Sequence, residues 1–249
     1  MSADNELHMI RLDLSTPRLF ALMRAQRLPL QQVDLGYAIH CQMAALFGEL
    51  IPKPFAIEAA DRLVKVLGYC SAPIEELESR ARAIGDPLAY SLVDWTTAAS
   101  KPMPSTWSKG QRLHFAVEVC PTVRKSKAGE YHRAGAEVDA FLARCWAVGD
   151  PSLPIDRAET YAAWLRQRID TMEGATILEV QMTMFKRQRM TRLTQGGQRR
   201  AVVSDRPQTR LEGVLEVTDA QAFTRLLRRG VGRHRAFGLG MMLLMQGRG

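Results

Sequence analysis

The alternation of strand-like and helix-like segments before residue 100 constrains the fold more than any other feature of this sequence. In these segments apolar residues recur either at every second position, as in a half-buried strand, or with the 3.6-residue period of a helix. The predicted elements are a strand over 7–14, a helical region over 17–49 that breaks near Pro29, strands over 55–60 and 63–70, a helix over 73–84 and a strand over 90–97. This order is typical of a ferredoxin-like domain, in which helices cover one face of an antiparallel sheet.

A similar order of elements, with extra helices and a long polar hairpin, follows a stretch rich in Pro, Ser and Gly at 98–110. The predicted elements are a strand over 111–120, helices over 134–148 and 156–171, a strand over 176–185, a basic hairpin over 186–200 that bends at Gly196 and Gly197, a strand over 211–217, a helix from the N-cap Asp219 to Arg229, and a strand over 241–245. We therefore predict the α+β class and tandem ferredoxin-like (RRM-like) domains, over residues 1–100 and 111–249, joined by a linker at 101–110.

Basic residues are concentrated toward the C-terminal end of the chain. The 249 residues carry 34 Lys and Arg against 26 Asp and Glu, and residues 181–249 alone hold 14 basic and 4 acidic residues. Of the basic residues 27 are Arg, whose planar guanidinium binds phosphates through two hydrogen bonds and stacks on bases. This distribution favours a nucleic-acid partner. The alternative is a solvated basic face in a protein encoded by a G+C-rich genome.

Simpler patterns exclude other classes of protein. No apolar run reaches the roughly 18–20 residues of a membrane-spanning helix, and the opening MSADNELHMI lacks the order of a secretory signal, so we expect a cytoplasmic protein. Cys41, Cys70, Cys120 and Cys145 form no C-x-x-C pair, so they are predicted to be reduced thiols without a disulfide framework or a zinc site. No group of Asp, Glu and His has the spacing of metal ligands, which predicts neither a metal nor a cofactor.

A glycine-rich segment at 230–240 joins the last predicted helix to the last strand. Its glycines would let backbone amides approach a ligand, and its basic side chains would suit phosphate oxygens. These residues are Gly230, Gly232, Gly238 and Gly240, with Arg233, His234 and Arg235. The helix-to-strand order differs from the strand-to-helix order of Walker and dinucleotide loops. The alternative is a tight connection in which the glycines serve only to turn the chain.

Three segments together resemble the CRISPR repeat-processing endoribonucleases of the CasE type, which serve the type I-E Cascade effector. The region 211–244 resembles the C-terminal signature of that family, from the Gly-Val-Leu that starts at Gly213 through the four glycines named above. The segment 111–122 is similar to a family strand that ends in a C-P step. Tyr37 and His40 match a Y-x-x-H pair of the first helix. The three segments span most of the chain.

The resemblance implies two ferredoxin-like domains and metal-independent cleavage of the repeat hairpin in precursor CRISPR RNA. It further implies attack by the 2′-hydroxyl, which leaves a 2′,3′-cyclic phosphate and a 5′-hydroxyl. The protein would then stay bound to the mature crRNA beside other subunits of a Cascade-like effector complex. The stretch 18–33 departs from the family pattern, because it places the Y-x-x-H pair farther from the first strand, so a relative from another CRISPR subtype stays open.

Tyr37 and His40 are the candidate catalytic residues. RNA carries its own nucleophile, so cleavage needs a group that removes the 2′-hydroxyl proton, a group that protonates the leaving oxygen, and cations near the phosphate. Histidine has an ordinary pKa near 6.5 and serves either role near neutral pH. Residues at i and i+3 share a helix face, so His40 is predicted to transfer the proton and Tyr37 to be its partner or to position the 2′-hydroxyl; which is the acid stays open. The alternative is that both merely edge the apolar stripe of the helix. His8, His114 and His132 are predicted to be structural, and His132 lies in a basic loop where it could also touch RNA.

RNA binding is assigned to two basic regions, because duplex RNA is recognised through phosphates, shape and accessible bases rather than by a helix in its narrow major groove. The predicted stem contacts in the hairpin are Lys186, Arg187, Arg189, Arg192, Arg199 and Arg200. The predicted contacts near the cut are Arg233 and Arg235, with His234 and the four glycines of the segment 230–240. Two other functions stay open: a non-catalytic RNA-hairpin-binding subunit of the same fold, and a small-molecule enzyme that uses the glycine-rich segment as a phosphate cradle.

Overall fold

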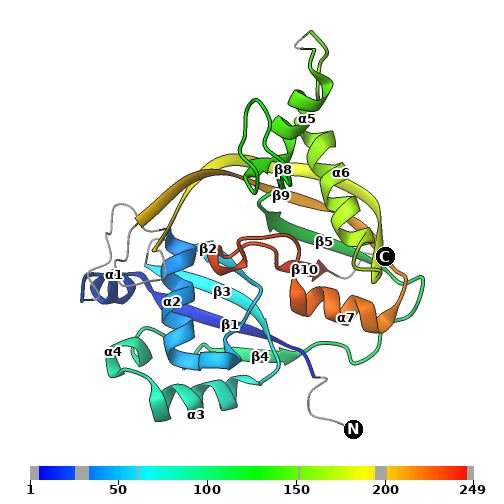
Figure 1. Cartoon of the computed structure of the whole chain (residues 1–249). Helices are drawn as coiled ribbons and strands as arrows, with labels where there is room; N and C mark the ends of the chain where they lie inside the picture. The colour runs from blue at the N-terminus through cyan, green and yellow to red at the C-terminus, as the bar shows by residue number, and fades with distance from the viewer. Residues whose placement is uncertain (1–5, 26–33, 61, 151, 194–200, 246–249) are drawn as a thin grey trace.

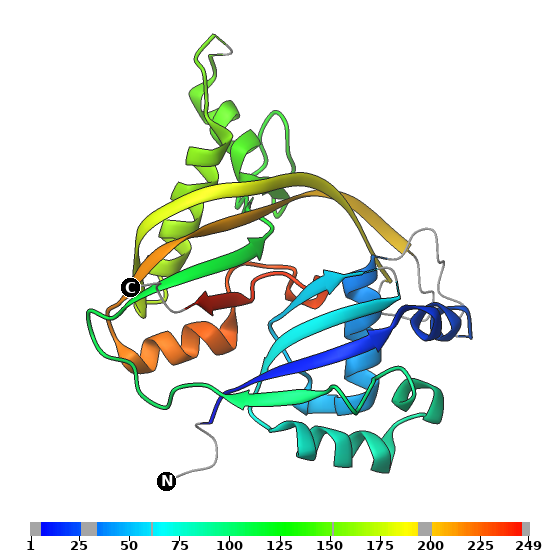
Figure 2. The same cartoon turned by 180° about the vertical axis from the view of Figure 1, so that it is seen from behind.

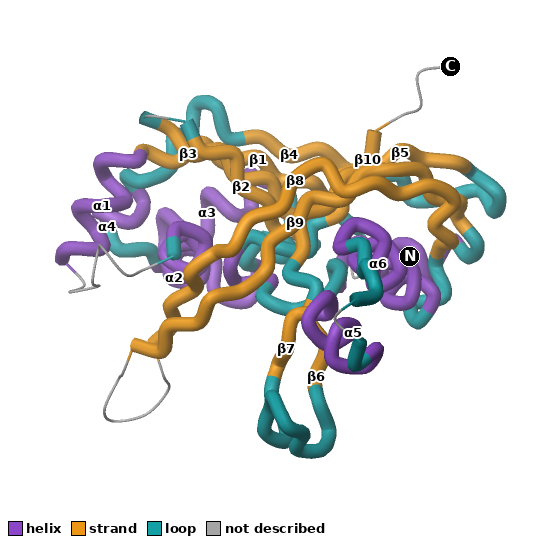
Figure 3. Tube along the Cα trace, turned by 90° about the horizontal axis from the view of Figure 1, so that it is seen from above, coloured by secondary structure: helices purple, strands orange, loops and turns teal. Residues whose placement is uncertain are grey.

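The computed structural model describes residues 6–25, 34–60, 62–150, 152–193 and 201–245, and for 191–193 and 201–202 it describes the backbone only. Two antiparallel four-stranded sheets form the framework, one in each half of the chain (Figure 1). Seen from above, most helices lie on the same side of the two sheets (Figure 3). The predicted α+β class with tandem ferredoxin-like domains is confirmed.

The N-terminal sheet has the strand order β2-β3-β1-β4, and neighbouring strands are antiparallel. Its strands are β1 (His8–Ser15), β2 (Phe55–Ala59), β3 (Leu63–Cys70) and β4 (Ala99–Pro102). Its helices are α1 (Thr16–Ala25), α2 (Leu35–Phe47), α3 (Ile74–Ile84) and α4 (Pro87–Tyr90), with a 3-10 turn η2 (Gly48–Leu50). Alternate residues of β1, such as Ile10 and Leu12, pack in one hydrophobic cluster with Ile39 and Met43 of the predicted apolar stripe on α2.

The prediction of a strand over 90–97 is wrong, because the fourth strand is β4. The chain just before β4 forms a turn that starts at Asp94. The carboxylate of Asp94 accepts hydrogen bonds from the backbone N–H (3.1 Å) and the hydroxyl (2.6 Å) of Thr96. β4 lies at the edge of the sheet, where its final Pro102 needs no ladder donor. The strand reaches into the predicted linker, and the domain limits 1–100 and 111–249 stay a proposal.

The C-terminal sheet has the strand order β10-β5-β9-β8. Its strands are β5 (Arg112–Val119), β8 (Ala175–Leu193), β9 (Ala201–Val217) and β10 (Met242–Met245). The helices of this half are α5 (Ala140–Val148), α6 (Arg157–Asp170) and α7 (Ala220–Arg229), with a 3-10 turn η3 (Arg235–Phe237). As predicted, Asp219 caps α7, and its carboxylate accepts a 2.7 Å hydrogen bond from the backbone N–H of Ala222.

The prediction of a helix that starts at residue 134 is wrong over its first residues. Residues 137–139 form β7 (Glu137–Asp139), which pairs with β6 (Thr122–Arg124) in a separate two-stranded sheet. Asp139 is both the last residue of β7 and the N-cap of α5, because its carboxylate accepts a 2.8 Å hydrogen bond from the backbone N–H of Phe141. A capping side chain ends an extended segment and starts a helix at one residue, so α5 cannot begin earlier.

The hairpin of β8 and β9 is longer than predicted, because both strands continue far beyond the body of the sheet. Register shifts near Ile177 and Met182 mark bulges, which bend and twist paired strands. The ribbon therefore arches from the C-terminal sheet toward α2 (Figures 1 and 2). There the side-chain amide of Gln188 donates a 3.0 Å hydrogen bond to the carboxylate of Asp34.

The two halves also meet through buried side chains. Tyr69 of β3 is 2% exposed and belongs to the hydrophobic cluster of the C-terminal half, and its hydroxyl donates a 2.8 Å hydrogen bond to the carbonyl oxygen of Met242. This contact fixes β3 beside β10. Among the described residues, no helix has the length and apolar character needed to cross a bilayer.

Candidate active site and nucleic-acid interface

The first two turns of α2 carry the two candidate catalytic residues. Asp34 caps this helix, and its carboxylate accepts a 3.2 Å hydrogen bond from the backbone N–H of Tyr37. Tyr37 and His40 are both half-buried, whereas Ile39 on the next face is fully buried. They therefore lie where the helix passes from the core to the surface.

Phe237, which the sequence analysis did not single out, lies against Tyr37. The two rings stack with centroids 5.5 Å apart and an interplanar angle of 25°. The backbones also approach closely, because an ideal Cβ added to Gly36 would lie 2.9 Å from the Cα of Phe237 and closer still to its carbonyl group. The glycine-rich segment and the start of α2 therefore form one surface.

The imidazole of His40 is partly buried, and the positive charge of Lys53 acts on it. Its Nδ1 is buried and has no hydrogen-bond partner among the described residues, so Nε2 is the nitrogen through which a substrate could exchange a proton. Burial, and then the charge of Lys53, lower the pKa of His40 below 6.5. The neutral imidazole therefore predominates at pH 7.

Lys53 is a second residue that the sequence analysis missed. It is exposed just before β2, and burial of part of the side chain and then the charge of Arg235 lower the pKa of its ammonium group. The charge of Lys53 therefore acts on His40, and the charge of Arg235, from the other half of the molecule, acts on Lys53. The sequence signal was weak, since a single Lys between two prolines carries no recognisable motif.

The glycine-rich segment 230–240 forms a folded loop between α7 and β10. The backbone N–H of Val231 donates to the carbonyl oxygen of Gly240 (2.8 Å), and the N–H of Gly240 donates to that of Glu118 (2.7 Å). Gly238 has a φ of 77°, and a Cβ there would lie 2.7 Å from the Cδ1 of Ile57. Only glycine combines that backbone with that approach.

Three of the four glycines predicted to contact RNA, namely Gly230, Gly238 and Gly240, are buried. Gly232 is half-buried against Trp164. Their burial favours the alternative in which these glycines serve to turn the chain. Among the basic side chains of the segment, Arg233 is exposed and Arg235 donates a hydrogen bond to the carbonyl oxygen of Arg229.

His234 points to an acidic partner rather than to solvent. Its Nε2 lies 2.7 Å from Oε1 of Glu137 on β7. One ligand atom each of Cys120, Glu137 and His234 lies within 4.8 Å of the others, a grouping that the spacing of these residues in the sequence did not reveal. Such donors could hold a metal ion, but the hydroxyl of Thr122 already donates a 2.6 Å hydrogen bond to the same Glu137 oxygen.

The basic hairpin presents exposed side chains from β8. Lys186, Arg187 and Arg189 are exposed, and Arg189 lies 3.8 Å from Asp205 across the hairpin in a solvent-exposed ion pair. Of the other predicted stem contacts, Arg192 lies on β8 with its side chain not described, and Arg199 and Arg200 lie outside the described residues.

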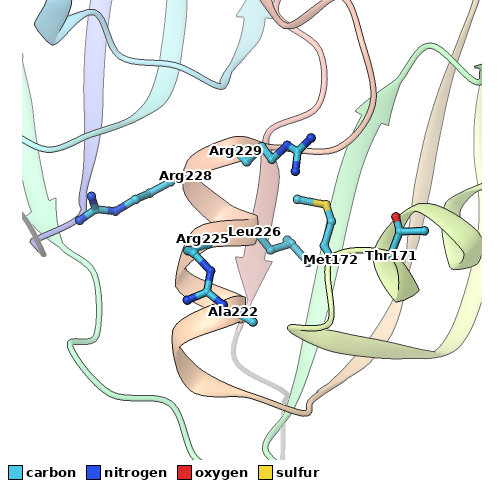
Figure 4. Close-up of a pocket in the computed structure, with 7 residues that line it drawn as sticks. All are labelled: Thr171, Met172, Ala222, Arg225, Leu226, Arg228 and Arg229. Carbon is cyan, nitrogen blue, oxygen red and sulfur yellow. The ribbon is translucent and has the colours of Figure 1, made fainter.

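A further basic surface lies on α7. An open pocket of about 410 Å³ lies between this helix and the residues that follow α6 (Figure 4). It is lined by Thr171, Met172, Ala222, Arg225, Leu226, Arg228 and Arg229. Arg228 points toward β1, where it donates a 2.8 Å hydrogen bond to the carbonyl oxygen of Glu6, while Arg225 and Arg229 are exposed. The sequence gives no motif for this surface beyond helical spacing of arginines.

Solved structures share this arrangement of two sheets. The chain is similar to Cse3 from Thermus thermophilus bound to an RNA that represents a pre-cleavage complex, with a TM-score of 0.62 and 20% identity over 96% of this chain and 99% of that one. It is also similar to Cas6e from Escherichia coli str. K-12, with a TM-score of 0.57 and 15% identity over 96% and 99%. A chain of a CRISPR RNA-guided surveillance complex matches with a TM-score of 0.56 and 14% identity over 95% and 99%.

At these identities the likeness shows a common fold. No curated protein sequence matches the chain. The model of the family described as CRISPR associated protein matches residues 7–246, which is nearly the whole chain, and the protein therefore belongs to the CRISPR-associated protein family.

Proposed function

We propose that this protein is a metal-independent endoribonuclease of the CasE (Cse3/Cas6e) type that binds and cuts the repeat hairpin of precursor CRISPR RNA. The observation that carries the proposal is the meeting of a half-buried Tyr37 and His40 with the cations Lys53 and Arg235 at one surface. Two groups able to transfer protons and two positive charges are the set that RNA cleavage by its own 2′-hydroxyl requires. The family and the shared fold support the same reading.

His40 is proposed to remove the proton of the 2′-hydroxyl. Its lowered pKa keeps it neutral at pH 7, and a neutral imidazole can accept a proton at Nε2, since Nδ1 is buried. The 2′-oxygen then attacks the adjacent phosphorus, and the bond to the 5′-oxygen of the next nucleotide breaks. This yields a 2′,3′-cyclic phosphate and a 5′-hydroxyl.

Tyr37 is proposed to give its phenolic proton to the leaving 5′-oxygen. A phenol hydroxyl is one of the side-chain groups that can act as a general acid. Each positioned acid or base contributes about 10²- to 10⁴-fold to a rate. Lys53 and Arg235 are proposed to stabilise the negative charge that builds up on the phosphorane oxygens.

The surrounding basic surfaces are proposed to bind the RNA. Stem contacts are assigned to Lys186, Arg187, Arg189, Arg192, Arg199 and Arg200, and Arg233 is assigned to the backbone near the cut. The exposed α7 arginines, Arg225 and Arg229, extend the positive surface from the glycine-rich loop. Phosphate contacts of this kind give binding a steep dependence on salt.

The product is proposed to stay bound as mature crRNA, with the protein as one subunit of a Cascade-like effector complex. The support is the shared fold with a chain of a CRISPR RNA-guided surveillance complex. The CRISPR subtype, and therefore the repeat that is cut, is left open by this likeness.

Cleavage of the host's repeat hairpin RNA in excess EDTA, under single-turnover conditions, tests the proposal. We expect one cut by the wild type and loss of at least about 10²-fold in rate for His40→Ala. The matched control is His114→Ala, which removes an exposed histidine of β5 and should leave the rate unchanged. A 2′-deoxy substitution at the cut nucleotide should abolish cleavage and preserve binding. If wild type and His40→Ala bind the RNA equally and neither cuts it, the protein is a non-catalytic hairpin-binding subunit.

A further inference from the structure

The carboxylate of Glu137 lies at the centre of a compact network beside the glycine-rich loop. One of its oxygens accepts a hydrogen bond from Thr122 (2.6 Å) and lies 2.7 Å from Nε2 of His234, and the other lies 3.9 Å from Nη1 of Arg233. From β9, Arg206 donates a 2.7 Å hydrogen bond to the backbone carbonyl of Glu137. The side chains of Glu137 and His234 are 15% and 17% exposed, so this acid is largely enclosed.

The backbone at His234 is held in an unusual conformation. Its φ is 62°, in the left-handed region that residues other than glycine rarely adopt. Such a conformation is strained for a residue with a Cβ and persists only where the surroundings hold it. The contact between its Nε2 and Oε1 of Glu137 holds the side chain of His234 in place.

The left-handed turn at His234 sets the direction of η3 and the position of Phe237. The carbonyl oxygen of His234 accepts a 2.8 Å hydrogen bond from the backbone N–H of Phe237, and the two rings lie 5.8 Å apart. Phe237 then packs against the small buried cluster of Cys120, Met190 and Leu239. Its ring also stacks on that of Tyr37, with centroids 5.5 Å apart.

We propose that Glu137 is a positioning residue of the active site: through His234 it holds the turn that places Phe237 against Tyr37. This inference rests on the proposed function, because Tyr37 is the group that is positioned. Glu137 acts on Tyr37 indirectly, through His234 and Phe237. It lies on β7 in the C-terminal half, and the ring that it positions, that of Tyr37, lies on α2 in the N-terminal half.

Glu137 is an ionised acid beside a surface that is proposed to bind RNA, and neighbouring groups stabilise its negative charge. The hydrogen bonds from His234 and Thr122, with the charges of His234 and Arg206, outweigh burial and hold the pKa of Glu137 at about 2. The carboxylate therefore stays ionised at every pH at which the protein would work. Because it lies near the proposed RNA path, its removal would favour RNA binding electrostatically rather than weaken it.

The test separates cleavage from binding in Glu137→Gln and His234→Gly. Glycine adopts the left-handed backbone without strain, so the second variant breaks the link and spares the loop. We expect each to slow single-turnover cleavage by at least about tenfold, since displacements near 1 Å cost up to about 10²-fold. The double variant should be no slower than the slower single one. Affinity for a 2′-deoxy repeat should be unchanged or tighter. The matched control is Glu130→Gln, which changes an exposed acid in the loop between β6 and β7.

A second readout does not depend on cleavage. The ring of Phe237 shifts the NMR signals of the stacked Tyr37 ring, and Phe237→Leu gives the value without that ring. In Glu137→Gln the Tyr37 signals should move toward those of Phe237→Leu, while in Glu130→Gln they should stay in place.

The outcomes distinguish this inference from the proposed function. If the wild type does not cut repeat RNA but Glu137→Gln moves the Tyr37 signals, the function is wrong and the positioning role stands. If the wild type cuts, and Glu137→Gln cuts equally fast with unmoved Tyr37 signals, the positioning role is overturned. Cleavage that is lost in EDTA and restored by zinc would assign Cys120, Glu137 and His234 to a metal ion, and would also overturn it.

Discussion

The substitution Gly36→Ala tests how much the cleavage rate depends on the geometry of the active site, as distinct from the stability of the fold. The Cβ of Gly36→Ala would lie 2.9 Å from the Cα of Phe237 and closer to its carbonyl group. Carbon atoms in ordinary contact lie about 3.5–4.0 Å apart, so the loop and α2 would have to separate by roughly 1 Å. Because Tyr37 stacks on Phe237, this displacement reaches the candidate catalytic pair directly.

The expected loss in cleavage rate is on the order of 10²-fold, the usual cost of a 1 Å misplacement, which corresponds to about 2.7 kcal/mol of transition-state stabilisation. A clash with backbone atoms should also lower the free energy of unfolding by about 1–3 kcal/mol, and the advantage of alanine over glycine in a helix, up to about 1 kcal/mol, offsets part of this loss. RNA affinity should stay within about threefold, because no basic residue is removed.

The assay is single-turnover cleavage at saturating protein, with thermal unfolding and RNA binding measured on the same samples. The control is Ala45→Gly, on an exposed position of the same helix. It should lower the free energy of unfolding by about 1 kcal/mol and leave the cleavage rate of the folded protein unchanged. Cleavage by Gly36→Ala at the wild-type rate would refute the role that we give to the contact between the loop and α2.

Three further outcomes are expected. If His40 is the base, the cleavage rate is level near pH 7 and falls about tenfold per pH unit only below its lowered pKa, hence below pH 6.5; a rate that falls instead as the pH rises through neutrality would make His40 the acid. Replacing Arg225 and Arg229 with Ala should reduce the slope of log affinity against log salt by about 0.7–0.9 for each lost phosphate contact, whereas Arg112→Ala, which removes a residue paired to Glu216 at 3.2 Å, should not. Phe223→Ala, at a fully buried position of α7, should lower the free energy of unfolding by about 3–5 kcal/mol in denaturant titrations, and a loss under 1 kcal/mol would contradict the packing described for the C-terminal core.

Local signals in the sequence predicted most of the fold. The stripe of α2 and the cap at Asp219 appear in the structure where the sequence places them, because capping and helical periodicity depend on residues a few positions apart. The strand β4 was missed because the residues Ala-Ser-Lys-Pro lack β-formers and pair only through contact with β1, far away in the sequence. The extended residues 137–139 were missed for the same reason, since they pair with β6.

The candidate site was predicted only in part. Tyr37 and His40 lie on one helix, so their proximity follows from spacing alone. Lys53, Phe237 and Glu137 come from three distant segments, and the tertiary fold alone brings them to the same region. The glycines of 230–240 could be recognised as important, but their burial, which separates shaping a loop from touching RNA, depends on how the two halves pack.

The chemical nature of the RNA ends tests the central claim most directly. Mass spectrometry of fragments from a single-turnover reaction with repeat RNA in EDTA would identify both ends at the cut. Attack by the 2′-hydroxyl predicts a 2′,3′-cyclic phosphate on the upstream fragment and a 5′-hydroxyl on the downstream one. A 3′-hydroxyl with a 5′-phosphate would show attack by water, and would contradict the roles proposed for Tyr37 and His40.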